Sequence, residues 1–255
     1  MARKENAALN GILLSEVDPR IIGIRIEEQA KADDASFESK GRLPGQKLAF
    51  KKRSSLTINI FFKIREISDL SERMQVIGKV NQWAVKGGEL SVSYRGSQKL
   101  SVFLSQAASP GDIRNYAEEI SLLFESDNWP YWSGLGSSYY LLTGTSGSTR
   151  IQIPGDAPTL VDISLYAIQN ISHIRLTVDN KTIAISNADI PAAGYVQFKH
   201  DDQGVLHIKK GDVSLYPLLD MDSADCLLTE GGSASVSFET DGEAEIRISA
   251  IGRWH

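Results

Sequence analysis

The 255-residue sequence is poor in features that mark secreted and membrane proteins. It contains a single cysteine, Cys226, so it can form neither an internal disulfide nor a cysteine-based zinc cluster, and it suits a reducing compartment. No apolar run approaches the length of a membrane span. The apolar stretch 11–14 is too brief for the core of a signal peptide. We therefore expect a protein made in the cytoplasm, without membrane insertion.

The sequence also lacks the motifs of common nucleotide and acyl-transfer sites. It has no P-loop. The pair Gly134 and Gly136 lacks the third glycine of a dinucleotide-binding loop, and the stretch 144–147 lacks the spacing of a nucleophile elbow. The densest basic run, Lys51 to Arg53, is short and has no interleaved aromatic residues, so it predicts a solvated loop. We expect no cofactor and no nucleic-acid binding.

Charge is divided unevenly along a chain of otherwise ordinary composition, with 42% hydrophobic and 23% charged residues. Residues 1–135 contain 19 Lys/Arg and 17 Asp/Glu, a net charge of +2, whereas residues 136–255 contain 8 and 15, a net charge of −7. The stretch 127–138, which separates these regions, is rich in turn-forming and aromatic residues. Together these features predict two domains, 1–135 and 136–255.

Apolar and polar residues alternate with a period of two along most of the chain, which is typical of half-buried strands. Short strands separated by Gly-, Asp- and Asn-containing turns favour a mainly β fold made of two β-sandwich domains. The alternating runs are 22–26, 56–62, 90–94, 100–104 and 120–124 in the first half, and 161–165, 174–178, 205–208, 236–238 and 246–248 in the second. The stretch 95–97 predicts a hairpin loop.

One segment has helical instead of strand periodicity. Asp69 followed by Glu72 resembles a capping box, and the glycines at 87 and 88 would end a helix. We predict a single helix over 69–86 in the first domain, packed on the core along an apolar stripe with Trp83 at its end. That stripe consists of Leu70, Met74, Ile77, Val80 and Ala84.

Two polar segments resemble metal sites. A two-residue turn at 203–204 would make His200 and His207 a cross-strand pair near Asp202, and zinc uses these ligand types. A one-residue shift in register would separate the histidines, so we favour an exposed hairpin. The segment 220–225 resembles a calcium loop, but Ala224 stands where an oxygen ligand is needed and Asp225 where glycine is needed. We expect no bound metal.

Two further groups suggest carbohydrate chemistry. Glu243 and Glu245 share one face of a strand, and glycoside hydrolysis uses a carboxylate pair. Nothing in their surroundings suggests the burial that would raise the pKa of one of them, so we expect no catalytic residue. The aromatic residues Trp129, Tyr131 and Trp132 would provide flat rings for stacking on sugars, or would cover a domain junction.

The order of these elements is similar to that of the distal tail proteins of long-tailed bacteriophages and prophages. The second half resembles their C-terminal galectin-like sandwich, although Ser172-His173-Ile174-Arg175 does not match the H-x-N-x-R sugar-binding motif of galectins. The similarity rests on the strands 20–27 and 55–62, the helix ending in 81–83, the strands 88–94, 99–104 and 116–124, the junction 129–131, and the segments 155–165 and 246–254.

The resemblance implies a structural protein of the virion tail tip, assembled in the bacterial host cytoplasm. Such a protein forms a ring, usually a hexamer, that joins the tail tube to the tail hub or baseplate and to the host-attachment apparatus. The implied partners are further copies of the chain, the tail tube protein, the tail hub or tail-associated protein, and receptor-binding proteins. The first domain would build the ring and the second would project outward. The alternative is a carbohydrate-binding accessory module that uses Trp129, Tyr131 and Trp132.

Overall fold

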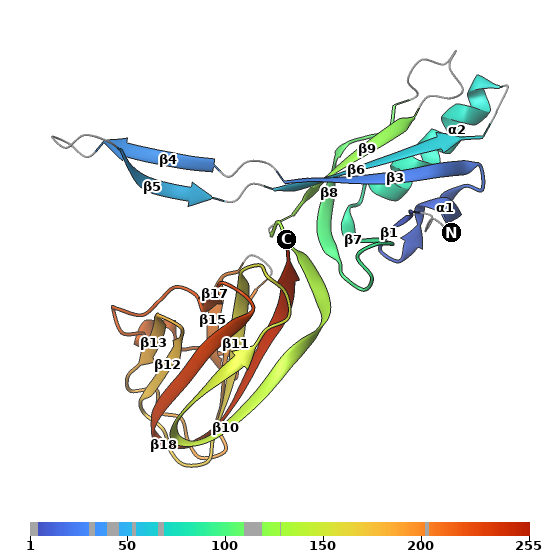
Figure 1. Cartoon of the computed structure of the whole chain (residues 1–255). Helices are drawn as coiled ribbons and strands as arrows, with labels where there is room; N and C mark the ends of the chain where they lie inside the picture. Colours follow the sequence, from blue (N-terminus) through green and yellow to red (C-terminus); the bar gives the residue numbers. More distant parts are fainter. Residues whose placement is uncertain are drawn as a thin grey trace. The chain divides into compact units, whose positions relative to one another are not determined.

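The protein has a mainly β fold, as predicted, with its strands in two large antiparallel sheets (Figure 1). A computed structural model describes residues 5–30, 34–39, 46–52, 55–65, 69–109, 119–127, 129–201 and 204–255. The chain divides into two compact units, Met1–Trp132 and Ser133–His255. In the part of the chain that is described, no helix is both long and apolar enough to cross a membrane.

The first unit is built on one seven-stranded sheet with the order β2-β1-β7-β8-β9-β6-β3. The five runs predicted in this half form strands, and the predicted hairpin loop at 95–97 joins two of them. Sequence periodicity did not reveal the two short strands near the N-terminus. The strands are β1 (Ala7–Leu9), β2 (Ile12–Leu13), β3 (Ile21–Ala30), β6 (Leu56–Ile64), β7 (Gly88–Val92), β8 (Leu100–Gln106) and β9 (Ile120–Ser126).

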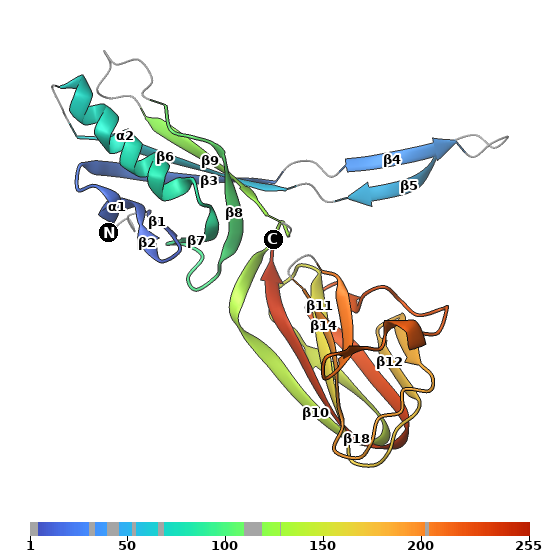
Figure 2. The ribbon, with the colours of Figure 1, turned by 180° about the vertical axis from the view of Figure 1, so that it is seen from behind.

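The predicted helix is present as α2 (Leu70–Ala84), which lies along the sheet of the first unit (Figure 2). Asp69 caps it, because its side chain accepts a hydrogen bond from the backbone N–H of Ser71 at 2.8 Å. The predicted stripe was partly wrong: Leu70 and Met74 are each 45% exposed. Periodicity alone does not set the rotation of a helix to within one residue. The side chains buried along α2 are Arg73, Val76, Ile77, Val80 and Ala84.

A buried carboxylate ties α2 to the chain before β3. Asp18 follows the four-residue helix α1 (Leu14–Val17), which was not predicted, and its side chain is 1% exposed. It accepts hydrogen bonds from Arg20 Nε at 2.8 Å and from Lys79 Nζ of α2 at 2.9 Å. The hydrogen bonds from Arg20, and then that from Lys79, hold the pKa of Asp18 well below its usual range despite burial.

Between β3 and β6, β4 (Asp34–Ser39) and β5 (Gln46–Lys52) form a separate two-stranded hairpin. It leaves the larger sheet beyond the last pair of β3 and β6, Ala30 with Leu56. Within the described ranges, neither strand pairs with any other strand. The loop predicted at Lys51 to Arg53 was wrong in part, since Lys51 and Lys52 belong to β5; Arg53 lies outside the described residues.

The second unit is a nine-stranded sheet around one core. Its main path is β13-β12-β18-β11-β14-β15-β16, with β10 paired to β18 and β17 to β11. Ile183 of β13 and Ile208 of β15 belong to the same core cluster, so the sheet curls until strands far apart in its order face one another. The strands are β10 (Trp132–Gln152), β11 (Thr159–Ala167), β12 (Ile174–Val178), β13 (Lys181–Ile185), β14 (Tyr195–His200), β15 (Leu206–Lys210), β16 (Val213–Ser214), β17 (Leu228–Thr229) and β18 (Ser233–Trp254).

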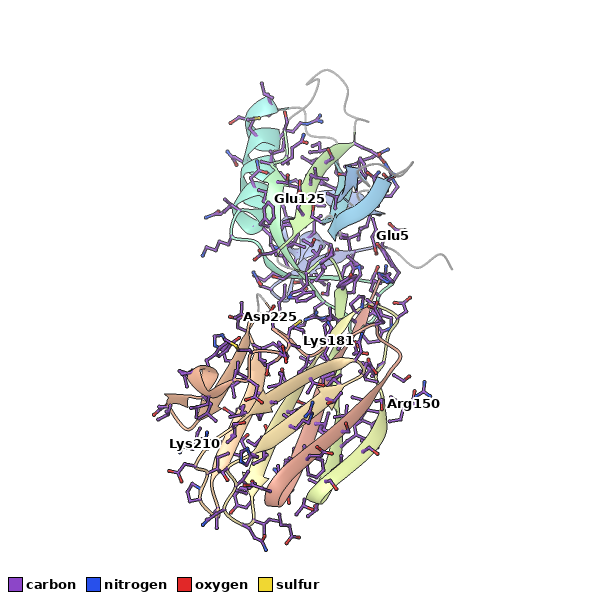
Figure 3. All side chains as sticks on the ribbon, turned by 90° about the vertical axis from the view of Figure 1, so that its left-hand side faces the viewer. Glu5, Glu125, Arg150, Lys181, Lys210 and Asp225 are labelled. Carbon is purple, nitrogen blue, oxygen red and sulfur yellow. The ribbon has the colours of Figure 1, made fainter. Side chains whose placement is uncertain are left out.

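The stretch 127–138, which was predicted to separate the two domains, is a strand from Trp132 onward despite its turn-forming residues. β10 is rich in Gly, Ser and Thr, and it forms a strand because β18 supplies the pairing partner. Arg150 points outward at the edge of β10 in Figure 3, and its Nη2 donates to Ser233 Oγ of β18 at 3.0 Å. The limits 135 and 136 of the predicted domains fall inside β10, and independent folding of 1–135 and 136–255 stays a prediction.

Different parts of β18 pair with different strands of the sheet. Its first part, to Thr240, pairs with β12, and its second part, from Ala244, pairs with β11. Between these parts, Gly242 leaves no room for a side chain, since a Cβ atom there would lie 2.3 Å from the backbone oxygen of Asn170. Asp241 beside it accepts hydrogen bonds from the backbone N–H groups of Ser172 and His173. The long closing strand therefore belongs to the second unit.

We expect Asp241→Asn to weaken the fold in a pH-dependent way. Partial burial raises the pKa of Asp241, but hydrogen bonds from Ser172 and His173 outweigh it and lower that pKa from 3.8 to about 2. A lowered pKa in the folded state stabilises the fold above the unfolded value, and the stabilisation is lost as pH falls through the folded value. The difference in unfolding free energy between parent and variant should therefore shrink between pH about 4 and about 2. Urea unfolding across this range measures it, and a constant difference would contradict the assignment.

Candidate functional site

The predicted aromatic group lies at the end of the first unit, and its members differ in exposure. Trp132 is fully buried; its Nε1–H donates to Glu28 Oε2 at 3.1 Å, and the Arg95 guanidinium lies 5.4 Å from its ring centroid. Tyr131 is 7% exposed, and Trp129, whose ring centroid is 6.5 Å away, is partly buried. Sugar stacking needs an open ring face, which the buried Trp132 does not offer. A carbohydrate role for the three residues stays a prediction.

Glu28 and Arg95, which both contact Trp132, also form an ion pair with each other. Arg95 Nη2 donates to Glu28 Oε2 at 2.7 Å and Arg95 Nε to Oε1 at 3.1 Å, the two-pronged geometry of a strong ion pair. Burial raises the pKa of Glu28, but hydrogen bonds from Arg95, Tyr94 and Trp132 outweigh it and leave that pKa below its ordinary value. The pair is a structural contact inside the first unit.

The histidine pair envisaged as a zinc site does not form, because the hairpin register differs by one residue from the one it required. His200 pairs with Leu206 and His207 with Lys199, so the two imidazoles point to opposite faces. The His200 side chain is 2% exposed; its Nε2 accepts from Leu227 N–H, and its Nδ1–H donates to Asp162 at 2.9 Å. His207 is exposed, and Asp202 lies outside the described residues.

The other segments that were considered as sites make contacts that stabilise the fold. Asp220 accepts a hydrogen bond from Ser186 Oγ at 3.1 Å, and its backbone oxygen accepts from Ser223 N–H, which makes a turn. The stretch 144–147 lies within β10, as do Gly134 and Gly136. Among the residues that the structure describes, no three His, Cys, Asp or Glu side chains gather closely enough to hold a metal ion.

Glu243 and Glu245 alternate with buried residues along β18 and lie on its outer face. Glu245 accepts a hydrogen bond from Arg247 Nε at 2.8 Å, so its carboxylate is neutralised by a neighbour on the same strand. A shallow hollow of about 190 Å³ lies beside Glu245 and Arg247. The two glutamates therefore lie on an open sheet surface, and this geometry does not support catalysis by them.

Two more hollows adjoin on the outer face of β12, β13 and β18. They have volumes of about 380 and 370 Å³ and share Arg175 and Glu239, which are cross-strand partners. One is lined by hydroxyl-bearing side chains of β10, β12 and β18, and the other by acidic residues and His173. These surfaces suit polar contacts, and large aromatic rings do not dominate them.

Comparison with known proteins gives matches in structure but none in sequence. No family model matches the chain, and no curated protein matches it. The SPP1 Dit protein, described as a paradigm of the hub adsorption apparatus in phages that infect Gram-positive bacteria, is similar with a TM-score of 0.66 and 12% identity, over 99% of this chain and 100% of that chain. The activated phage P2 baseplate with Ca is less similar, with a TM-score of 0.41 and 10% identity over 99% and 98%. The predicted resemblance to distal tail proteins is confirmed for the fold.

Proposed function

We propose that this chain is a structural protein of a phage tail tip, located in the hub or baseplate region of the virion. The observation that carries the proposal is the Dit-like fold over the full length of both chains. In this role the protein forms a homo-oligomeric ring, with six copies as the expected number, between the tail tube protein and the tail hub or receptor-binding proteins. It has no enzymatic activity.

The β4–β5 hairpin supports an assembly role. An isolated two-stranded hairpin is at best marginally stable in water, and a third strand or another surface is normally needed to stabilise it. Within the described residues of the chain, β4 and β5 pair only with each other. A neighbouring copy in the ring would provide the missing surface. In a ring of more than two copies, each contact joins two different faces. The hairpin of one copy supplies one of these faces, and the first unit of the neighbouring copy supplies the other.

The mass of the purified full-length chain tests the ring. We expect light scattering to show a species of several copies of the 28.0 kDa chain, with a six-fold ring visible by electron microscopy. A carbohydrate-binding accessory module would instead remain near 28.0 kDa. A chain that is still monomeric at near-millimolar concentration, and that forms no ring on isolated tails, contradicts the proposal.

A hairpin deletion tests where the ring contacts lie. Because Ala30 pairs with Leu56, replacing residues 31–55 by Asn-Gly closes β3 and β6 with a two-residue turn and should preserve the larger sheet. We expect this variant to have the same free energy of unfolding as the parent monomer but to form no ring. The matched control replaces the β15–β16 turn residues Gly211 and Asp212 by the same Asn-Gly pair and should keep the ring. A deletion variant that assembles as the parent does would remove the hairpin from the contact.

A further inference from the structure

Three neighbouring strands of the second unit present an ordered set of side chains on their outer face. In the register of β14, β11 and β18, Tyr195 is opposite Tyr166, and Tyr166 is opposite Glu245. Two residues along the strands, on the same face, Ser164 lies between Gln197 and Arg247 in the same way. The six positions alternate with core residues, so all of them face away from the core.

The centre of this set is hollow because its middle residue is small. Ser164 is surrounded by longer side chains, and the space above it measures about 190 Å³. It is lined by Ser164, Tyr166, Tyr195, Glu245 and Arg247. Pockets for drug-sized ligands measure roughly 300–1,000 Å³, so this hollow suits a single ring-sized group.

The side chains around the hollow are held in place before any ligand arrives. The Tyr195 hydroxyl donates to Ser164 Oγ at 3.0 Å and accepts from Gln197 Nε2 at 3.1 Å, which orients its ring. Arg247 Nε donates to Glu245 Oε1 at 2.8 Å. Preorganisation of this kind reduces the entropy lost on binding. Despite these bonds, Tyr166 is 44% and Tyr195 42% exposed, so much aromatic surface stays open.

We propose that this hollow binds one sugar ring of a saccharide. Two open tyrosine rings match the apolar C–H faces of a sugar, and the Arg247 and Glu245 side chains offer donors and acceptors to its hydroxyl groups. The opposite charges cancel, which favours a neutral hydroxyl-rich ligand over an anion such as phosphate or nucleic acid. A cation would find only one carboxylate here, already paired with arginine.

A protein partner fits this surface less well. Stable protein interfaces bury about 800 Å² on each side around an apolar core. On one side of the hollow the next outward positions are polar, since Asp162, Lys199 and Ser249 continue the face of β11, β14 and β18. On the other side Ile168, two residues beyond Tyr166, is 42% exposed, a single apolar side chain beside the two tyrosines. The proposed site is separate from Trp129, Tyr131 and Trp132, and from the segment 172–175 that departs from the galectin motif. It does not depend on ring formation, since all its residues come from one copy.

Nuclear magnetic resonance titration of the full-length chain tests the site. The probes are D-glucose, D-galactose, D-mannose, L-rhamnose and N-acetylglucosamine, each added to millimolar concentration and above, with glycerol and inorganic phosphate as non-sugar probes. We expect at least one sugar to shift backbone amide signals of β11, β14 and β18 around residues 164–166, 195–197 and 245–247 in a saturable way. Absence of such shifts with all five sugars, or equal shifts with glycerol or phosphate, overturns the proposal.

Variants at the hollow decide whether the shifts report binding there. Tyr166→Ala and Tyr195→Ala should each raise the apparent dissociation constant roughly tenfold, the scale of one lost aromatic contact. Glu245→Gln, which keeps the shape of the side chain, should also weaken binding and serves if an alanine variant misfolds. The matched control is Tyr216→Ala, since Tyr216 is 43% exposed but does not line the hollow, and it should bind as the parent does. The proposal is overturned if variants of the residues that line the hollow fold but keep the parent's affinity. It is also overturned if the amide signals shift with protein concentration alone.

Discussion

Gly155→Ala is expected to destabilise the second unit by about 2–5 kcal/mol, the sum of about 1–2 kcal/mol of backbone strain and about 1–3 kcal/mol of overpacking against a fixed atom. Gly155 has φ +99°, a conformation that side-chain-bearing residues rarely adopt, and a Cβ atom there would lie 1.9 Å from the backbone oxygen of Arg253. That oxygen cannot simply move away, because it accepts hydrogen bonds from the backbone N–H groups of Asp156 and Ala157 at 3.0 and 3.1 Å. The substitution should therefore loosen the end of β18 from the segment before β11.

Chemical denaturation of the parent and variant measures this effect, with Gly211→Ala as the matched control. Gly211 also has a positive φ, +58°, but a Cβ atom there would meet nothing within 4 Å. Its replacement should cost only the backbone strain, about 1–2 kcal/mol. The difference between the variants isolates the close approach to Arg253. Equal costs for the two substitutions would show that the end of β18 can shift without penalty.

Trp132→Ala is expected to destabilise the first unit by about 3–5 kcal/mol, the usual cost of removing a fully buried large aromatic side chain. The loss includes the hydrogen bond from its indole to Glu28 and the contact of its ring with Arg95. The Glu28–Arg95 pair, whose side chains are 16% and 25% exposed, would then border a cavity where the ring of Trp132 had been.

The control for this prediction is Trp129→Ala, in the same aromatic group. Trp129 is only partly buried, so its truncation should cost about 1 kcal/mol. Thermal and denaturant unfolding of the first unit would rank the two variants by their loss of unfolding free energy. If Trp129→Ala proved the more damaging, the assignment of Trp132 as the anchor of the group would be wrong.

The part of the fold that depends on local pattern was predictable. β6, β9, β11 and β12 alternate apolar with polar residues strongly enough to be identified individually, and Asp69 marked the start of α2. These signals are local because a strand shows its buried face at every second residue, and a helix begins where a side chain can satisfy free N–H groups. Where the local pattern is weak, as in β10, the pairing partner decides the structure.

The sequence by itself determined a mainly β protein with one long helix and an order of elements similar to distal tail proteins. Only the tertiary structure decided which faces and partners those elements use. It set the register that separates His200 from His207, buried Trp132 beneath Arg95, and brought Tyr166, Tyr195 and Glu245 into one row from three strands. The physical reason is that side chains alternate with a period of two, so a one-residue change in pairing moves each to the other face. Periodicity identifies a strand, whereas long-range pairing assigns its neighbours and therefore its surface chemistry.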